Sequence, residues 1–285
     1  MSSPGPLVET SWLAERLGEE GPVVLDASHR MPGQGRARDA FEARRIPGAI
    51  FFDIESISDR ASDLPHMLPS AEDFAAMVGA LGIGAQDRIV VYDDAGLFSA
   101  ARAWWMFRAM GFDAVSVLNG GLPRWLAEGR PVEAGAPSPR APKRFSVSRR
   151  PALATDASGV RRALSTPGAL VLDARPSGRF EGRDPEPRPG LRKGRMPGAA
   201  SLPHSELLAG GALKPAAELR ALLEARGWTP DAEVVATCGS GITACVVALA
   251  LNSIGAPDAA VYDGSWAEWG RSDNDPHLFP VATGA

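Results

Sequence analysis

The sequence predicts an α/β protein made of two tandem domains, each with a mostly parallel β-sheet flanked by helices. Short aliphatic runs of strand length alternate along the chain with longer segments typical of helices. The order of these segments in the first half of the chain recurs in the second half. An ordered recurrence of this kind is typical of a duplicated domain.

In the first half, a helix is expected to begin near Thr10, and Ser70 is expected to cap a helix that continues to Leu81. A buried helix is expected over Ala100–Met110, because this segment is rich in apolar side chains. Aliphatic runs bounded by polar residues predict the strands. These strands are expected within Pro22–Ser28, at the end of Arg45–Asp53, within Arg88–Asp94 and over Val115–Leu118.

The second half repeats these segments with loops of different length, which predicts domains over residues 1–130 and 152–285. Residues 131–151 are rich in Pro, Ala, Arg and Ser, and we expect a stiff, extended linker there. Asp26 and Asp173 end matching strands, and we expect both to be structural. The matching segments are Leu170–Ala174 with Val23–Ala27, Arg195–Ala199 with Arg45–Ala49, Val234–Val235 with Val90–Val91, and Val261–Gly264 with Leu118–Gly121.

Composition limits the function classes. The 285 residues are 45% hydrophobic and 22% charged, which is ordinary for a globular protein. The net charge of −4 predicts no nucleic-acid or membrane partner, and no apolar run approaches the roughly 18 residues of a membrane span. Met1–Thr10 lacks the pattern of a signal peptide. We expect a cytoplasmic monomer.

The most informative stretch is the glycine-containing loop Cys238–Thr243, which lies between a predicted strand and an apolar predicted helix. The first N–H groups of a helix have no intrahelical partner, and the helix dipole favours negative charge there. Gly239 and Gly241 would let successive N–H groups point inward and bind an anion. A thiolate at Cys238 would be stabilised, which predicts a nucleophile. The alternative is that Cys238 is a small buried apolar residue.

Two further features narrow the chemistry of this loop. Cys245 lies two helical turns beyond Cys238, too far for a disulfide, and is expected to fill the core. Cysteine phosphatases need an arginine that closes such a loop, but the sequence has Ala244 at that position. A loop without arginine suits a small, soft, singly charged atom such as a persulfide sulfur. In the first half, alignment places Asp94 opposite Cys238, so that copy is expected to be catalytically silent.

Together these features resemble the tandem-domain rhodanese sulfurtransferases, from about Leu7 to Phe279. The shared motifs are C-G-S-G-I-T-A in the second half only, L-D-A-R at a strand end, and R-x-P-G-A in both halves. The loop is similar to that of the 3-mercaptopyruvate sulfurtransferase branch, because thiosulfate-preferring members carry Arg and Lys where Gly239 and Ser240 stand. Other segments that match this branch are Phe51–Ile54, Asp59–Arg60, His66–Pro69 and Trp104–Arg108.

The resemblance implies two rhodanese-like domains and a ping-pong reaction without a metal or organic cofactor. Cys238 would take sulfur from 3-mercaptopyruvate, release pyruvate and pass the sulfur to cyanide, a thiol or thioredoxin. Arg179 and Arg188 would hold the carboxylate and keto oxygen of the substrate, since a planar guanidinium matches a carboxylate. The remaining loop residues Gly239, Gly241, Ile242 and Thr243 would surround the substrate and the persulfide.

The resemblance also implies a proton-handling group that contains Ser240, His66 and an acid, similar to a Ser–His–Asp triad. Asp53 and Glu55 both qualify as the acid, and we favour Glu55. The family usually has aspartate at the position of Glu55 and tryptophan at that of His29, so the sequence departs from the pattern at both.

Two other functions are compatible with the sequence. A thiosulfate:cyanide sulfurtransferase would share the fold, but a loop without a cation should bind doubly charged thiosulfate less well. A persulfide carrier in a sulfur relay would form the persulfide with little turnover of its own. A cysteine hydrolase is disfavoured, because no histidine lies near Cys238 in the sequence.

Overall fold

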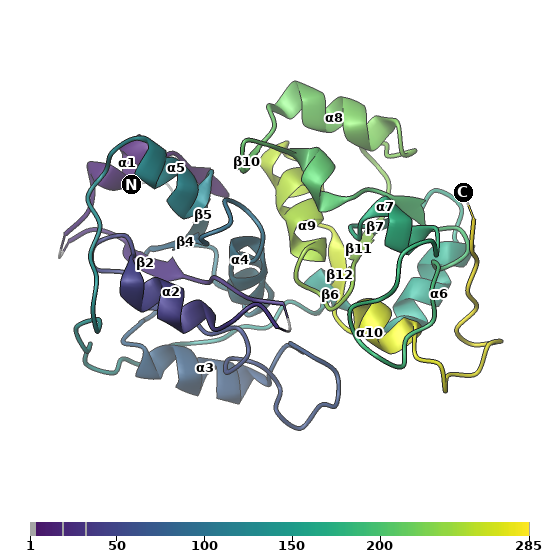
Figure 1. The fold of residues 1–285 in the computed structure, drawn as a ribbon, viewed down its shortest axis with the longest axis horizontal. Coiled ribbons are helices and arrows are strands. Elements are labelled where there is room, and N and C mark those ends of the chain that lie inside the picture. Colours follow the sequence, from purple (N-terminus) through teal and green to yellow (C-terminus); the bar gives the residue numbers. More distant parts are fainter. Residues whose placement is uncertain (1–3, 19, 32, 285) are drawn as a thin grey trace. The chain divides into compact units, whose positions relative to one another are not determined.

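The computed structural model describes residues 4–18, 20–31 and 33–284. The chain divides into two compact units, which are described separately (Figure 1). Unit 1 comprises residues 1–61, 68–150 and 209–213, and unit 2 comprises residues 62–67, 151–208 and 214–285. Each unit therefore takes a short segment from the other half of the chain.

Unit 1 contains a five-stranded sheet in the order β1-β5-β4-β2-β3, in which all paired strands are parallel. The strands β2 to β5 confirm those predicted from the aliphatic runs, whereas β1 was not predicted. They are β1 (Leu7–Val8), β2 (Val23–Asp26), β3 (Ile50–Phe51), β4 (Ile89–Tyr92) and β5 (Val115–Leu118). The helices are α1 (Thr10–Ala14), α2 (Ala37–Ala43), α3 (Ala71–Ala80), α4 (Ala100–Ala109) and α5 (Gly121–Ala127).

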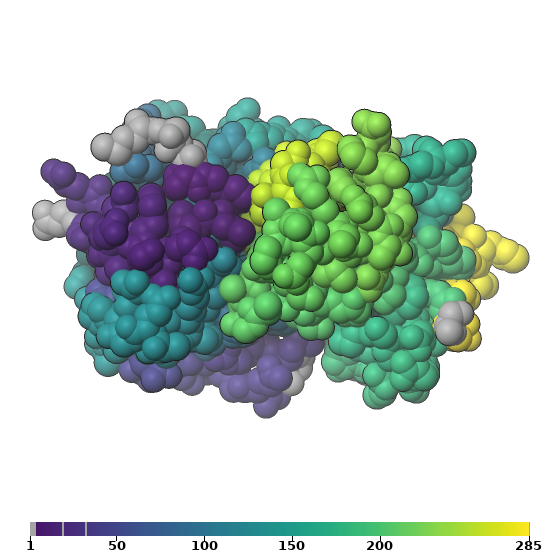
Figure 2. All heavy atoms as spheres, turned by 90° about the horizontal axis from the view of Figure 1, so that it is seen from above, coloured from purple at the N-terminus to yellow at the C-terminus, as the bar shows by residue number. Residues whose placement is uncertain are grey.

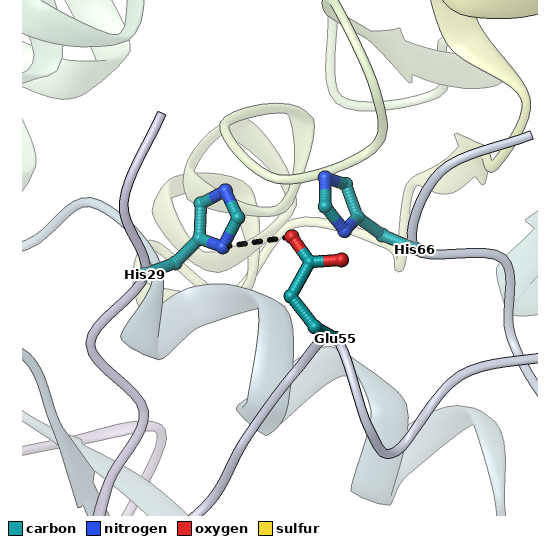
Figure 3. Close-up of side chains that lie close together, drawn as sticks. All are labelled: His29, Glu55 and His66. Carbon is teal, nitrogen blue, oxygen red and sulfur yellow. Dashed lines mark ion pairs between the residues drawn. The ribbon is translucent and has the colours of Figure 1, made fainter. Parts of the chain in front are cut away.

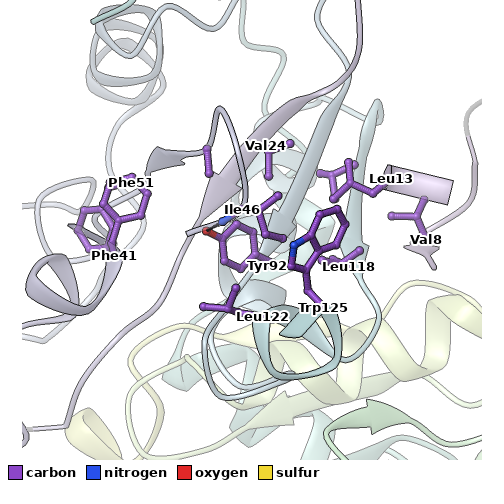
Figure 4. Close-up of a cluster of buried hydrophobic side chains, with 12 residues drawn as sticks. Val8, Leu13, Val24, Phe41, Ile46, Phe51, Tyr92, Leu118, Leu122 and Trp125 are labelled. Atoms are coloured by element: carbon purple, nitrogen blue, oxygen red, sulfur yellow. Dashed lines mark hydrogen bonds between the residues drawn. The ribbon is translucent and has the colours of Figure 1, made fainter. Parts of the chain in front are cut away.

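One hydrophobic core of unit 1 joins β2 and β4 to α1, α2 and α5. Leu13, Ile46, Tyr92 and Trp125 are all 0% exposed and lie in this cluster (Figure 4). Elsewhere in the unit, the Ser70 hydroxyl accepts a hydrogen bond from the Asp73 amide at 3.0 Å, which confirms the predicted cap of α3.

The stretch predicted as a linker packs against unit 1. Residues 134–150, all of them described, contain no helix or strand. The Lys143 amide donates to the Gly79 carbonyl at 2.9 Å, and Phe145, 5% exposed, packs against the ring of Phe107. A buried aromatic side chain holds this segment to the unit, so it is not a free tether.

Unit 2 repeats the sheet of unit 1, in the order β6-β12-β11-β7-β8, and its paired strands are also parallel. This repetition confirms the α/β fold with duplicated domains. The strands are β6 (Ala154–Thr155), β7 (Leu170–Asp173), β8 (Ala200–Ser201), β11 (Val234–Thr237) and β12 (Ala260–Tyr262). A two-stranded hairpin, β9 (Leu208–Ala209) and β10 (Ala212–Leu213), interrupts this half of the chain.

The helices of unit 2 differ in burial. Helix α9 is buried from Ala244 to Leu251, so its N-terminus can hold a loop rigidly above the sheet. Helix α8 exposes most of its residues and lies in the green surface of Figure 2. None of the helices among the described residues is both long and apolar enough to cross a membrane. The helices are α6 (Ala157–Ser165), α7 (Ser177–Phe180), α8 (Ala216–Glu224), α9 (Ala244–Ser253) and α10 (Ser265–Trp269), with 3₁₀ turns η1 (Pro151–Leu153) and η2 (His204–Leu207).

Candidate active site

The predicted loop Cys238–Thr243 connects β11 to the buried helix α9. Its shape is fixed by Ser265, whose hydroxyl accepts from the amides of Cys238 at 3.2 Å and Gly241 at 3.1 Å. The same hydroxyl donates to the Tyr262 carbonyl at 2.7 Å. Two loop amides therefore bind the neutral hydroxyl of Ser265, a residue that the sequence had not indicated, and not an anion.

The carbonyl groups of the loop are bound on its other side by α10. The Trp266 amide donates to the Cys238 carbonyl at 3.0 Å, and the Ala267 amide donates to the Gly239 carbonyl at 2.9 Å. Cys238 is 2% exposed, and both cysteines are free thiols. Cys245 is fully buried, as expected of a core residue. Both cysteines are therefore almost completely buried in this structure.

The corresponding loop of unit 1 corrects the sequence alignment by one residue. The Ala27 amide donates to the Tyr92 carbonyl at 2.8 Å, and in unit 2 the Ala174 amide donates to the Thr237 carbonyl, also at 2.8 Å. Asp93, the residue after Tyr92, is thus the counterpart of Cys238, and the prediction that Asp94 occupies this position is wrong. The cause is that the unit 1 loop reaches its helix one residue later.

Asp93 fills the loop of unit 1 with its own carboxylate. Its Oδ2 accepts from the amides of Phe98, Ser99 and Ala100 at 2.8 Å each, and its Oδ1 accepts from the Ala95 amide at 3.0 Å. Complete burial raises the pKa of Asp93, although these four amide donors act in the opposite direction. In unit 1, three amides around the start of the helix after the loop therefore converge on one carboxyl oxygen.

In unit 2, the corresponding positions at the start of α9 are those of Ile242, Thr243 and Ala244. Unit 2 has cysteine where unit 1 has Asp93, so no side-chain carboxylate of the loop occupies that position. The loop of unit 2 can therefore accept an anionic group from outside, or an anionic sulfur carried on Cys238.

Arg179, one of the two predicted substrate arginines, lies against this loop. A Cβ atom placed on Gly239 would be 3.0 Å from its Nη2 atom, which is tighter than ordinary contact. A side chain at position 239 would therefore crowd this guanidinium, whereas the backbone conformation that calls for glycine in this loop is at Gly241, with φ of 76°.

Arg179 belongs to a buried network of alternating charges. Its Nε donates to Glu186 Oε2 at 3.1 Å and its Nη2 to the same oxygen, while the other oxygen of Glu186 accepts from Arg175 Nη1 at 2.9 Å. Arg175 in turn binds Asp173, and both side chains are fully buried. Burial alone would lower the pKa of Arg175, but Asp173 and Glu186 raise it above the ordinary arginine value.

The second predicted arginine, Arg188, lies beside His66. Its Nη2 is 3.3 Å from His66 Nε2. His66 comes from the first half of the chain, but segment 62–67 belongs to unit 2, and the ring is in a residue only 4% exposed. Because a guanidinium can only donate, this contact requires Nε2 to be the acceptor and the ring proton to lie on Nδ1. Arg188 also lines a cavity of about 410 Å³ with Pro65, Ala267 and Arg271.

The two candidate acids of unit 1 have different environments. Asp53 accepts from the Glu55 amide at 3.2 Å and from the Ser56 hydroxyl at 2.7 Å, so its carboxylate stabilises the local turn. The carboxylate of Glu55 is largely exposed and lies 3.5 Å from Nδ1 of His29 (Figure 3). The pairing of His29 with Glu55 was not predicted. The available signal was that the sequence departs from the family pattern at both of these positions.

The structure thus brings Arg179 to the loop and His66 to Arg188, all within unit 2. Ser240 is 6% exposed within the loop. The sequence had not indicated Ser265, which shapes the loop, or Glu186, which binds Arg179. Ser265 follows Asp263-Gly264 as Gly121 follows Asn119-Gly120, and both residues have positive φ, 49° and 53°. That repeated turn was the signal available for Ser265. The strand register makes Val261 the counterpart of Val117, so the predicted match of Val261–Gly264 with Leu118–Gly121 is wrong by one residue.

Comparison with known proteins is consistent with this geometry. The chain is 45% identical to human 3-mercaptopyruvate sulfurtransferase, over 92% of this chain and 91% of that protein. It is 43% identical to the Escherichia coli 3-mercaptopyruvate sulfurtransferase, over 93% and 95%. It is also 45% identical to bovine thiosulfate sulfurtransferase, over 92% and 91%.

The fold comparison gives the same family. The crystal structure of the E. coli 3-mercaptopyruvate sulfotransferase SseA matches with a TM-score of 0.84 at 39% identity, and covers 93% of this chain and 100% of that chain. The family model described as the rhodanese-like domain matches residues 9–128 and 156–272, which is one match in each half of the chain. The chain therefore belongs to the rhodanese family, with two rhodanese-like domains in tandem.

Proposed function

We propose that this protein is a 3-mercaptopyruvate sulfurtransferase. The observation that carries the proposal is the loop of unit 2, in which Cys238 stands where the silent copy holds an amide-bound carboxylate. Its relatives named 3-mercaptopyruvate sulfurtransferase, aligned over nearly the whole chain, support the same activity. The proposed place of action is the cytoplasm, where a reducing environment keeps Cys238 a free thiol.

In the first half-reaction, the Cys238 thiolate attacks the sulfur of 3-mercaptopyruvate. An S–S bond forms, the C–S bond breaks, and its electron pair remains on carbon as the enolate of pyruvate. The proton of the substrate thiol ends on that carbon, so pyruvate leaves and Cys238 carries an anionic persulfide. The amides of Ile242, Thr243 and Ala244, which correspond to those that bind Asp93 in unit 1, would stabilise this terminal sulfur.

In the second half-reaction, an acceptor attacks the outer sulfur of the persulfide. Cyanide takes this sulfur to become thiocyanate, and the S–S electron pair returns to Cys238 as the thiolate. A thiol acceptor would leave as its own persulfide. Reduced thioredoxin would give its disulfide and hydrogen sulfide, because two thiols supply the two electrons. The residues present need no metal or organic cofactor for these steps.

The proposal assigns proton transfer to Ser240 and His66, with Glu55 as the favoured acid and Asp53 as the alternative. The lone pair of His66 Nε2 accepts from Arg188 in the structure, so in this proposal Nε2 receives a proton only after Arg188 has turned to the substrate. The local hydrogen bonds of the Asp53 carboxylate favour Glu55 for this role.

Arg179 and Arg188 are proposed to bind the carboxylate and keto oxygen of the substrate. A guanidinium fork matches the planar geometry of a carboxylate next to a carbonyl group. The position of Arg179 supports this role, because its guanidinium lies beside Gly239, the residue that follows the nucleophile. Gly241, Ile242 and Thr243 would enclose the transferred sulfur.

Thiosulfate:cyanide sulfurtransferase activity is the second candidate, since bovine thiosulfate sulfurtransferase is as similar in sequence as the human enzyme above. The loop has Gly239 and Ser240 and no cationic residue, which disfavours a doubly charged donor. We expect kcat/KM with cyanide to be higher for 3-mercaptopyruvate than for thiosulfate. A clear preference for thiosulfate would reverse the assignment.

Mass spectrometry separates an enzyme from a persulfide carrier. With 3-mercaptopyruvate alone, the protein should gain the mass of one sulfur atom, about 32 Da, and release one equivalent of pyruvate. Cys238→Ser should abolish both events with little change in unfolding temperature, because the side chains differ little in size. A persulfide adduct that cyanide cannot discharge catalytically would favour the carrier.

A further inference from the structure

Arg179 brings a positive charge to the loop but does not carry that charge alone. Its Nη2 atom lies close to Gly239, and its side chain is 17% exposed. The same Nη2 and the neighbouring Nε both donate to one oxygen of Glu186. The guanidinium next to the loop is therefore in direct contact with a carboxylate.

Glu186 is buried, so water screens its charge poorly. Its side chain is 2% exposed, and its second oxygen binds Arg175 at 2.9 Å. Arg175 is also held by Asp173, through Nε at 3.0 Å and Nη2 at 2.6 Å. The network has two carboxylates and two guanidinium groups, and its formal charge is zero. Arg179 consequently offers hydrogen-bond donors to the loop with little net positive potential.

We propose that Glu186 sets the sulfur-donor preference by cancelling the charge of Arg179, so that the site favours a singly charged carboxylate group over doubly charged thiosulfate. This inference rests on the proposed function. Attraction of an anion grows with its charge, so a neutralised guanidinium disadvantages a dianion more than a monoanion. The Nη1 group of Arg179 can still donate a hydrogen bond that orients the sulfur donor. Glu186 is thus a positioning and charge-setting residue that acts through Arg179.

The test is Glu186→Gln, with kcat/KM measured for both donors and cyanide as acceptor. The variant removes the negative charge, so the thiosulfate-to-mercaptopyruvate ratio of kcat/KM should rise about tenfold. The matched control is Glu181→Gln, since Glu181 pairs at 2.6 Å with Arg183, whose side chain is 64% exposed. The control should leave the ratio unchanged. A merely structural role for Glu186 would lower both values together, and an unchanged ratio would overturn the proposal.

A double variant separates charge cancellation from other effects of the substitution. If Glu186 acts through Arg179, the change caused by Glu186→Gln should disappear in the background Arg179→Met. The ratios of Arg179→Met and of the double variant should then be equal. If Glu186→Gln raises the ratio as much without Arg179 as with it, the proposed route is wrong.

Loss of a buried partner can prevent folding, so Glu186→Asp serves as a second variant. Its shorter side chain keeps the charge but withdraws it from Arg179, and the donor ratio should shift in the same direction by a smaller factor. A folded Glu186→Asp protein with the wild-type ratio would contradict the inference. Failure of the wild-type protein to turn over 3-mercaptopyruvate would instead contradict the proposed function.

Discussion

At the scale of single residues, the site depends on side chains whose hydrogen bonds direct other groups. Ser265 illustrates this, because one hydroxyl accepts two loop amides and donates to a carbonyl group. Its φ of 49° lies in the left-handed region, which costs a residue other than glycine about 1–2 kcal/mol. The three hydrogen bonds offset this cost and hold the loop amides inward.

Removal of the Ser265 hydroxyl should therefore destabilise unit 2 and the loop together. Ser265→Ala leaves two buried amides without their acceptor, at a cost of about 2–4 kcal/mol in the free energy of unfolding. Ser265→Gly loses the same hydrogen bonds but relieves the backbone, so its loss should be smaller. Chemical denaturation measures both variants. Equal stability of Ser265→Ala and the wild-type protein would show that the hydroxyl does not hold the loop.

Arg188 offers a second test at this scale. If it binds the carboxylate of the donor, Arg188→Ala should raise KM for 3-mercaptopyruvate about 10- to 100-fold, as expected for a lost hydrogen bond to a charged group. Discharge of a preformed persulfide by cyanide should change little. The control is Arg183→Ala, which removes an exposed arginine of the same segment. An equal loss in both half-reactions would exclude the carboxylate role.

At the scale of elements, the loop between a strand and a buried helix binds a carboxylate in unit 1, and we propose that the corresponding loop of unit 2 binds an anionic sulfur. The silent copy is the clearer example, because Asp93 supplies the anion internally. Glycine is needed at position 121 of unit 1, because a Cβ atom there would lie 2.4 Å from the Asp93 carbonyl oxygen. In unit 2, the corresponding Ser265 places its hydroxyl in the loop instead.

If the carboxyl group of Asp93 is removed, the loop of unit 1 should therefore bind a small carboxylate from solution. Asp93→Ala leaves four amides without their acceptor, of which those of Ser99 and Ala100 belong to buried residues, and should cost at least about 2 kcal/mol in the free energy of unfolding. Acetate should restore part of the lost thermal stability by binding the folded loop, whereas chloride at equal ionic strength should restore less. The wild-type protein is the control. If acetate and chloride raise the melting temperature of Asp93→Ala equally, the loop is not an anion receptor.

Much of the fold and the candidate site could be predicted from local sequence. The run Val115–Leu118 is a strand with the predicted bounds, and Ser70 caps α3 as its position indicated. Glycines and the following apolar segment were sufficient to locate the loop Cys238–Thr243. Such features depend on neighbours in the chain, which is why sequence patterns report them.

The features that sequence reasoning missed depend on groups distant in the chain or on exact register. A loop longer by one residue changes no local pattern, so Asp94 was aligned where Asp93 stands. In the sequence, Glu186 could not be distinguished from the other acidic residues, because its hydrogen bonds with Arg175 and Arg179 form only in the folded chain. The pairing of His29 with Glu55 likewise joins two loops of unit 1.

At the scale of the whole molecule, the two duplicated sheets differ in the groups that bind the aspartate at the end of a matching strand, Asp26 in unit 1 and Asp173 in unit 2. Asp173 accepts from the Arg175 amide at 3.0 Å, and the Arg175 guanidinium also binds its carboxylate. Asp26 accepts from the Ser28 amide at 2.9 Å in the same arrangement, but serine brings no charge. One buried acid therefore has a cation, whereas its counterpart in unit 1 has a neutral neighbour.

This difference predicts a pH dependence of stability that arises in unit 1. Burial raises the pKa of Asp26 from 3.8 to about 6, although hydrogen bonds from Ser28 and Tyr92 act in the opposite direction. The native state thus binds the proton more tightly than the unfolded chain, so stability falls as pH rises between about 4 and 6. Above that window, the buried charge costs up to about 3 kcal/mol.

Asp26→Asn should remove this dependence, because an amide cannot ionise. Near pH 4 the variant and the wild-type protein should have similar free energies of unfolding, and by pH 7 the variant should be more stable by up to about 3 kcal/mol. Asp173→Asn provides the contrast: it leaves Arg175 buried without its carboxylate and should destabilise unit 2. Urea unfolding from pH 4 to pH 7 measures both. Parallel stability curves for Asp26→Asn and the wild-type protein would mean that Asp26 is ionised at no cost, so the neutral neighbour at position 28 would not matter to the fold.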